Sequence, residues 1–150
     1  MRIAVMGAGG VGGYFGGRLL QAGHDVTFIA RGRHLEALQA NGLTLKSPLG
    51  DAKLKVKAVG RAADAGPADI ALFAVKLWDT EESATQLRPV VEKGGFVIPF
   101  QNGVESVTRI GAILGKERVM GGAAYIAGRI AEPGVILHTG TIARLRFGPV

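Results

Sequence analysis

A glycine-rich turn near the beginning of the sequence has the spacing of a loop that binds phosphates. Its pattern, G-x-G-x-x-G, is formed by Gly7, Ala8, Gly9, Gly10, Val11 and Gly12. In this pattern the first glycine permits a tight turn, the second lets a pyrophosphate approach the backbone, and the third lets the next helix pack closely on the sheet. The start of that helix offers free N–H groups and the positive end of its dipole. Because the turn directly follows an apolar strand pattern, residues 7–12 are predicted to bind a dinucleotide.

A basic residue stands where NAD-binding domains of this kind carry an acid. The acid that accepts from the ribose hydroxyls belongs at the end of the second strand, about 20 residues after the glycines. Counting from Gly12 leads to Arg31. A guanidinium pairs with a 2′-phosphate, and one charge-assisted hydrogen bond of roughly 1.5–3 kcal/mol gives a roughly tenfold to hundredfold preference for it. Arg31 therefore predicts NADP as the cofactor, whereas Arg33 is equally well an exposed surface residue.

The segments around these residues alternate between strand and helix patterns. We expect strands at 2–6, 26–30, 70–75 and 96–100, and helices at 10–22, 34–40, 80–91 and 104–114. Unbroken apolar runs such as 70–75 suit parallel strands that are covered by helices on both faces. The predicted fold class is α/β, a Rossmann-type doubly wound, mostly parallel sheet. Further glycines in the first helix, Gly13, Gly16 and Gly17, predict close packing of that helix on the sheet or a close approach to the nucleotide.

Two regions depart from this alternation. Residues 43–47 and 53–59 flank a turn at 48–51 and are expected to form a hairpin insertion. Near the C-terminus, the strand-like segments are 119–131, 135–139 and 142–147. We expect these segments to add antiparallel or mixed strands at the edge of the main sheet.

Composition narrows the class of protein further. The chain has 150 residues, of which 47% are hydrophobic, so one globular domain is expected. The absence of cysteine removes disulfides and thiolate metal sites, and no metal site is predicted. The net charge of +6 is spread along the chain, so nucleic acid is not expected as a partner. The sequence has no signal-peptide pattern and no long apolar run, so we expect a cytoplasmic protein without membrane contact.

Three further motifs make the sequence resemble the ketopantoate reductase (2-dehydropantoate 2-reductase) family along its whole length. They are Ala74-Val75-Lys76-Leu77-Trp78, Gln101-Asn102-Gly103-Val104 and the strand-rich segment 120–149. The resemblance implies NADPH-dependent reduction of 2-dehydropantoate to pantoate, a step toward pantothenate. It also implies that residues 7–12 hold the pyrophosphate, Arg31 the 2′-phosphate, and that the backbone near Ala127 contacts the cofactor. Lys76 and Asn102 would line the nicotinamide and substrate side.

Lys76 and Asn102 also make chemical sense without the resemblance. Each directly follows an expected strand, and ligands of open α/β sheets bind beyond the carboxyl ends of the strands. Lys76 suits the carboxylate of a small-molecule substrate or a cofactor phosphate, and Asn102 can donate to a ketone oxygen or a ribose. Two plainer interpretations stay open. Lys76 would then be a solvated residue at a helix entry, and Asn102-Gly103 an ordinary turn.

The source of the proton for ketone reduction is missing from the predicted site. A positioned acid contributes about 10²–10⁴-fold to such a step. The resemblance implies a helical second domain after residue 150 that supplies a proton-donating lysine, and no residue of 1–150 is assigned as catalytic. His138 lies in an alternating strand pattern and is expected to be structural, while His24 and His34 lie beside the second strand, nearer the adenosine end. We therefore expect residues 1–150 to bind NADPH but to reduce a substrate poorly or not at all.

Other functions remain open at this point. The chain could be a stand-alone NADPH-binding or sensor module, or part of a reductase of another 2-oxo acid, because a fold does not determine a substrate. A face meant for a second domain would be apolar and would favour self-association as a homodimer.

Overall fold

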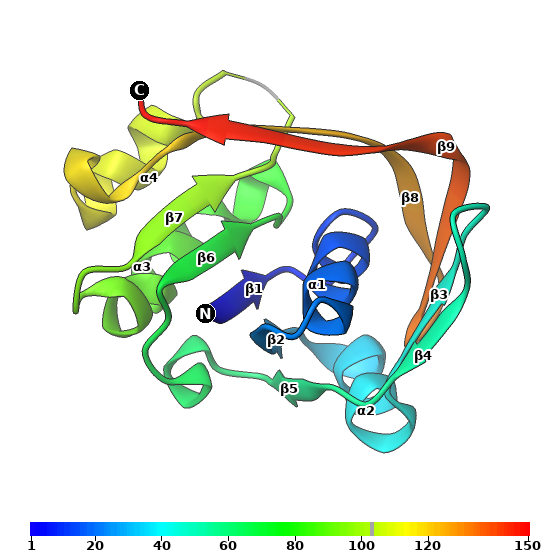
Figure 1. The fold of residues 1–150 in the computed structure, drawn as a ribbon. Helices are drawn as coiled ribbons and strands as arrows, with labels where there is room; N and C mark the ends of the chain where they lie inside the picture. The colour runs from blue at the N-terminus through cyan, green and yellow to red at the C-terminus, as the bar shows by residue number, and fades with distance from the viewer. Residues whose placement is uncertain (103) are drawn as a thin grey trace.

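A sheet of parallel strands forms the centre of the molecule (Figure 1), as the sequence predicts. The structure is a computed structural model, and it describes residues 1–102 and 104–150. In spatial order the five strands are β5 (Lys57–Val59), β2 (Asp25–Ile29), β1 (Arg2–Met6), β6 (Ile70–Phe73) and β7 (Phe96–Pro99). Every neighbouring pair is parallel. The chain adds β2 on one side of β1 and later adds β6 on the other side, so the strand order reverses at β1. The carboxyl end of β1 is therefore the switch point where such sheets bind ligands.

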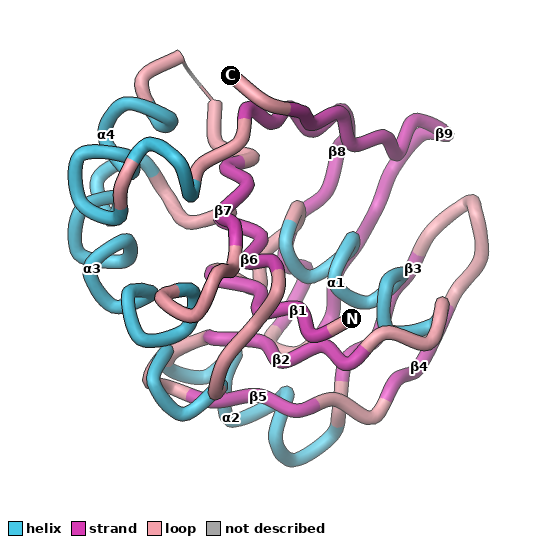
Figure 2. The backbone as a smooth tube through the Cα atoms, turned by 60° about the vertical axis from the view of Figure 1, so that its left-hand side comes forward, coloured by secondary structure: helices cyan, strands magenta, loops and turns pink. Residues whose placement is uncertain are grey.

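Helices cover both faces of this sheet. They are α1 (Gly12–Gln21), α2 (Gly32–Asn41), α3 (Thr80–Val91) and α4 (Ser106–Leu114), with short 3-10 turns η1 (Ala62–Ala65), η2 (Leu77–Asp79) and η3 (Lys116–Arg118). Helices α3 and α4 lie on one face and α1 lies on the other (Figure 2). Alternate residues of β1 serve the two cores: Ala4 and Met6 pack with α3, while Val5 packs with Tyr14 of α1. This alternation is why the strands read as unbroken apolar runs.

The C-terminal strands have the mixed pairing that the sequence predicts, but they form a second sheet rather than an edge of the first, so their predicted place is wrong. The sheet has the order β4 (Ala52–Leu54), β3 (Leu43–Lys46), β9 (Val135–Gly148) and β8 (Gly121–Glu132). Among the described residues, an isolated bridge between Val97 and Val119 is the only strand pairing between the tail and the main sheet. The two expected segments after Val135 are one strand, β9. It pairs in parallel with β3 and antiparallel with β8.

The expected hairpin at 43–59 is confirmed only in its first part. Strand β4 pairs antiparallel with β3. After β4 the chain leaves that sheet, and β5 joins the main sheet beside β2. Lys53 of β4 and Lys57 of β5 both face water. The alternation of charged and apolar residues therefore continues where the chain passes from one sheet to the other.

Helix α1 lies between the two sheets (Figure 1), and its glycines explain how it fits. A Cβ on Gly16 would lie 2.6 Å from the Phe28 ring of β2, and one on Gly17 would lie 3.0 Å from Leu45 of β3. Side chains at these positions would therefore push the sheets apart. The prediction of close helix–sheet packing is confirmed, and it applies to both sheets.

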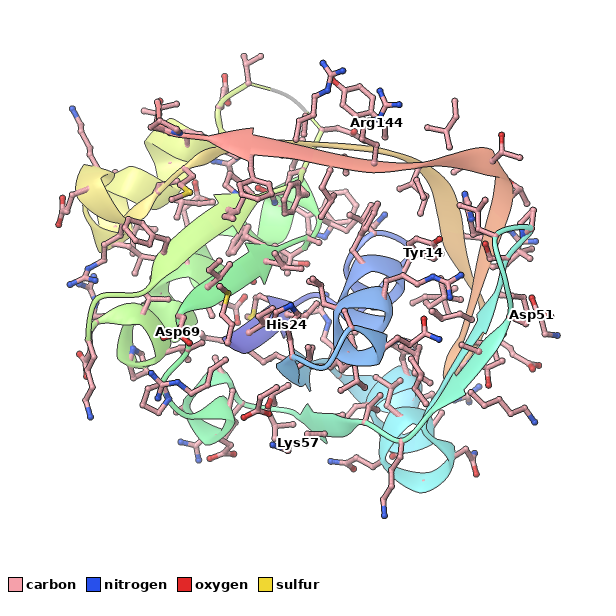
Figure 3. The ribbon with its side chains drawn as sticks, in the orientation of Figure 1. Tyr14, His24, Asp51, Lys57, Asp69 and Arg144 are labelled. Atoms are coloured by element: carbon pink, nitrogen blue, oxygen red, sulfur yellow. The ribbon has the colours of Figure 1, made fainter. Side chains whose placement is uncertain are left out.

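His138 is structural, as its strand pattern predicts. It is buried, and its Nε2 donates to the carbonyl of Ile142 over 2.9 Å. Its Nδ1 accepts from the hydroxyl of Ser47 at 2.8 Å, which links β9 to the turn after β3. Its ring lies 4.9 Å from that of Tyr14 of α1, which is labelled in Figure 3.

Candidate functional site

The candidate site is a crevice at the carboxyl ends of β1, β2 and β6, with a volume of about 390 Å³. The loops that follow these strands line it, together with Gly60 after β5, residues of α3 and Ile130 of β8. Of the predicted site residues, the structure brings together Gly7, Ala8, Gly9, Arg31 and Lys76 in its lining. This is the switch point that the strand order identifies.

A larger hollow of about 620 Å³ lies toward the amino-terminal ends of β1 and β2 and along β5. Among the side chains that line it, Lys57 and Asp25 already form an ion pair at 2.7 Å. His24 directly precedes β2, so it lies at the opposite end of that strand from the crevice. The hollow contains none of the predicted site residues, so the crevice is the better candidate.

The glycine turn has the shape that its sequence pattern requires. Gly7 has a φ of +95°, which side chains rarely tolerate, and a Cβ there would lie 2.8 Å from the carbonyl oxygen of Ala74. A Cβ on Gly12 would overlap the carbonyl oxygen of Gly7. Gly9 is different, because no atom lies within 4 Å of the position of its Cβ. Its open side leaves room for a ligand to approach the backbone.

Backbone amides of the turn are available to a ligand. Helix α1 begins after Val11 without a side-chain cap. In the part of the chain that the structure describes, the amides of Gly9, Gly10 and Val11 donate to no backbone carbonyl. Unpaired N–H groups at a helix start, together with the helix dipole, suit an anion.

His34 of α2 connects the glycine turn to the second sheet. Its Nε2 donates to the carbonyl of Ala8 over 2.6 Å, and its Nδ1 accepts from the amide of Gly134 at 3.0 Å. Gly10 also touches that sheet, because a Cβ there would overlap the carbonyl of Gly128. The sequence places His34 near the site, but it gives no sign of this bracing role, because Gly134 is far along the chain.

Arg31 lies at the mouth of the crevice and is paired with an acid that the sequence did not connect to it. Its Nη2 lies 3.1 Å from Oδ2 of Asp79, at the start of α3. The Arg31 side chain is 81% exposed and that of Asp79 is 18% exposed. Asp79 directly precedes α3, but its side chain makes no capping hydrogen bond to that helix. Its carboxylate faces Arg31 instead.

Lys76 follows β6 and lines the crevice with an exposed side chain. Its loop is held by Gln101, which donates to the carbonyl of Val75 over 2.9 Å and to Oγ1 of Thr80 over 3.0 Å. Gln101 in turn accepts from Ser106 at 2.8 Å. Gln101 thus ties the loop after β7 to the loop after β6 and fixes the backbone on either side of Lys76.

An ion pair between two helices holds the neighbouring turn. Arg109 of α4 donates to both carboxylate oxygens of Glu81, with distances of 2.6 and 2.7 Å, and to the carbonyl of Leu77 over 3.0 Å. The hydrogen bonds from Arg109 lower the pKa of the Glu81 carboxyl and raise that of the guanidinium. The start of α3, which carries Asp79, is therefore anchored from two sides.

Five of the predicted site residues lie outside the lining of this crevice in the described structure: Gly10, Val11, Gly12, Asn102 and Ala127. The first three belong to the glycine turn. Asn102 is exposed in the loop after β7, and the adjacent Gly103 of its motif lies outside the described residues. Ala127 is an exposed residue of β8 at a shift in the pairing with β9, next to the Gly128 that contacts Gly10.

Two general properties bear on the kind of site. Among residues 1–102 and 104–150, no group of three or more His, Asp or Glu side chains is placed to hold a metal ion. Within the same residues, no helix has the length and apolar character needed to cross a membrane.

The strand order, the glycine turn and the crevice at the switch point define a Rossmann-type α/β domain. Comparison with known proteins identifies its family. The sequence model described as "Ketopantoate reductase PanE/ApbA" matches residues 3–150. The chain belongs to the ketopantoate reductase family, whose members are oxidoreductases.

Individual relatives agree with this assignment. An uncharacterized oxidoreductase, YkpB of Bacillus subtilis, is 34% identical over 148 residues, which cover 99% of this chain and 48% of that protein. A 2-dehydropantoate 2-reductase of Pyrococcus abyssi is 36% identical, with 93% of this chain and 45% of that protein covered. The crystal structure of 2-dehydropantoate 2-reductase from Geobacter metallireducens superposes with a TM-score of 0.92 at 35% identity, covering 99% of this chain and 49% of that one. The chain thus spans about half the length of these relatives.

Proposed function

We propose that residues 1–150 bind NADPH in the crevice and form the cofactor-binding part of an oxidoreductase. The substrate would be 2-dehydropantoate or a related 2-oxo acid, reduced to the 2-hydroxy acid. The observation that carries the proposal is the placement of the glycine turn, Arg31 and Lys76 in the lining of one crevice. Relatives named 2-dehydropantoate 2-reductase support the substrate class.

The residues of the crevice fit this cofactor. The open side of Gly9 admits a pyrophosphate, and the amides that follow it lack backbone partners among the described residues. The exposed guanidinium of Arg31 stands at the end of β2, where the adenosine ribose belongs in Rossmann-type domains. A neutral turn with free amides suits the pyrophosphate, and the cation that follows it suits the separate 2′-phosphate of the adenosine ribose.

Each predicted residue then has a role. Bound NADPH supplies the hydride. Residues 7–12 hold its pyrophosphate, Arg31 pairs with the 2′-phosphate, and the backbone near Ala127 flanks the cofactor. Lys76 attracts the substrate carboxylate or a cofactor phosphate, and Asn102 donates to the ketone oxygen or a ribose. These interactions orient the ketone, and a proton must then reach the developing oxyanion.

Among the described residues that line the crevice, no side chain is assigned to donate that proton. Both ring nitrogens of His34 are engaged, with Ala8 and Gly134. Lys76 is already assigned to bind an anion. We therefore propose that residues 1–150 alone turn over slowly or not at all, and that a helical second domain of the kind found in the family supplies the acid. A steady-state assay of purified 1–150 with NADPH and 2-dehydropantoate tests this, and turnover at the rate of ordinary reductases would contradict it.

Location and assembly complete the proposal. An enzyme that reduces a small 2-oxo acid with NADPH works where both are dissolved, which places it in the cytoplasm. Exposed apolar side chains near the crevice and on β9, Trp78 and Phe147 among them, support self-association as a homodimer.

A fluorescence titration with NADPH and NADH tests the cofactor assignment. We expect Arg31→Ala to weaken NADPH binding by roughly tenfold to a hundredfold, because it removes a charge-assisted hydrogen bond to the 2′-phosphate. NADH binding should change much less. Equal losses for the two cofactors would remove Arg31 from the ribose site, and no binding of either would refute the proposed function.

A further inference from the structure

The crevice contains a carboxylate, that of Asp79, as well as the guanidinium of Arg31. Rossmann-type domains that bind NAD place a carboxylate after the second strand, where it accepts from the ribose hydroxyls. Here Arg31 occupies that position, and Asp79 reaches it from across the crevice, from the segment that follows β6. Because the guanidinium and the carboxylate are 3.1 Å apart, a group bound to one of them is within reach of the other.

Asp79 is held in place more firmly than Arg31. Its amide donates to the carbonyl of Lys76 over 2.9 Å, and the adjacent Thr80 donates to the carbonyl of Leu77 over 2.7 Å. It stands at the N-terminus of α3, where the helix dipole favours an ionised carboxylate. Arg31, with a side chain 81% exposed, is free to exchange partners.

The charges around the crevice are balanced rather than uniformly positive. Of the ionisable side chains in its lining, Arg31 and Lys76 are cationic, and Asp79 and Glu82 are anionic. A 2′-phosphate would have to displace Asp79 from Arg31 and would then lie beside its charge. A 2′-hydroxyl would instead find an acceptor in Asp79 without disturbing the ion pair.

We propose that Asp79 is a specificity-determining residue that gives the crevice dual cofactor use. The 2′-phosphate of NADPH pairs with Arg31, and the 2′-hydroxyl of NADH donates to Asp79. The inference rests on the proposed function, since it concerns the same nucleotide. It lowers the expected preference for NADPH below the tenfold to hundredfold that Arg31 alone gives.

The test is a titration of the wild-type chain, two variants of Asp79 and two control variants with NADPH and NADH. Asp79→Asn keeps the shape of the side chain and removes its charge. We expect it to raise NADPH affinity about threefold to fivefold, because an exposed ion pair no longer competes, and to lower NADH affinity by a similar factor. The ratio of the two affinities then rises about tenfold or more. Asp79→Ser, which shortens the side chain, should shift the ratio in the same direction.

Two matched controls separate the ion pair from a general effect of charge. Glu82→Gln removes a carboxylate from the same lining, and Asp64→Asn removes one from the opposite edge of the sheet. Both should change the ratio by less than about twofold, because Coulomb interactions at this range are screened by water and salt.

The outcomes distinguish this inference from the proposed function. A wild-type chain that binds neither cofactor refutes both. Binding of both cofactors with an unchanged ratio in Asp79→Asn refutes the role of Asp79 alone. An equal change of the affinity ratio in Asp79→Asn and Glu82→Gln also overturns the role of Asp79. The change would then come from the total charge of the crevice and not from the ion pair with Arg31.

Discussion

Gly9→Ala separates binding from folding more sharply than any other change in the glycine turn. Apart from Gly9 and its two chain neighbours, no described residue has an atom within 4 Å of the Cβ position, and Gly9 is not among the residues with positive φ. The free protein can therefore accept the methyl group. Since alanine also restricts the unfolded chain, we expect the free energy of unfolding to stay within about 1 kcal/mol of the wild-type value.

The same methyl group would fill the space through which a pyrophosphate reaches the backbone. Hydrogen bonds to a charged group are each worth about 1.5–3 kcal/mol, so losing one weakens binding roughly tenfold to a hundredfold. NADPH and NADH share the pyrophosphate, and both should lose affinity by the same factor. This common loss differs from the selective changes expected for Arg31 and Asp79.

Two measurements are needed, thermal melting and cofactor titration. Trp78 is the only tryptophan in the sequence, is 79% exposed and lies two residues after Lys76, so its fluorescence should report binding. Gly148→Ala is the matched control, because its Cβ also meets no atom within 4 Å and it lies at the end of β9. Gly7→Ala is the opposite control and should lower the melting temperature. If Gly9→Ala melts like the wild type and binds both cofactors as tightly, the phosphates do not lie over this turn.

Two further substitutions probe the support of the site and the acid stability of the fold. His34→Ala removes two hydrogen bonds and should cost about 1–3 kcal/mol in urea unfolding. It should weaken both cofactors equally, so a change in the NADPH to NADH ratio would contradict a purely bracing role. Asp69 is labelled in Figure 3. Hydrogen bonds from the backbone and side chain of Arg2 lower the pKa of its carboxyl below the usual 3.8. The contribution of the ionised Asp69 to stability is therefore complete above pH 3.8 and is lost as the pH falls through the lowered pKa. Asp69→Asn should therefore make the melting temperature fall less steeply at acid pH. An unchanged slope would argue against this role of Asp69.

Sequence patterns predicted the parallel sheet and its helices because the signals for them are local. Apolar runs such as 70–75 and the glycine at the end of α1 act over a few residues, and helix α3 has the predicted bounds, Thr80–Val91. The second sheet could not be predicted in this way. Its parallel contact pairs Thr44 with Val135, and alternation within each segment does not identify a partner so far along the chain.

The candidate site shows the same division. The glycine turn, Arg31 and Lys76 were found from spacing and from their positions after strands. The partners that hold them were not, because Asp79, Gln101 and the Ala8–His34–Gly134 contacts depend on how the loops fold back on one another. The cofactor roles of all the predicted site residues, Asn102 and Ala127 included, stay predictions.

The link between His34 and Gly134 has a consequence for the order in which the protein is built. These residues are 100 positions apart, and Gly10 and Gly128 meet in the same region. During synthesis the first strand, its turn and its helix leave the ribosome long before their supports exist. Contacts across so long a stretch form late in folding, because closing the intervening loop is entropically costly. A nascent chain can thus complete the crevice only after nearly all of these residues have emerged.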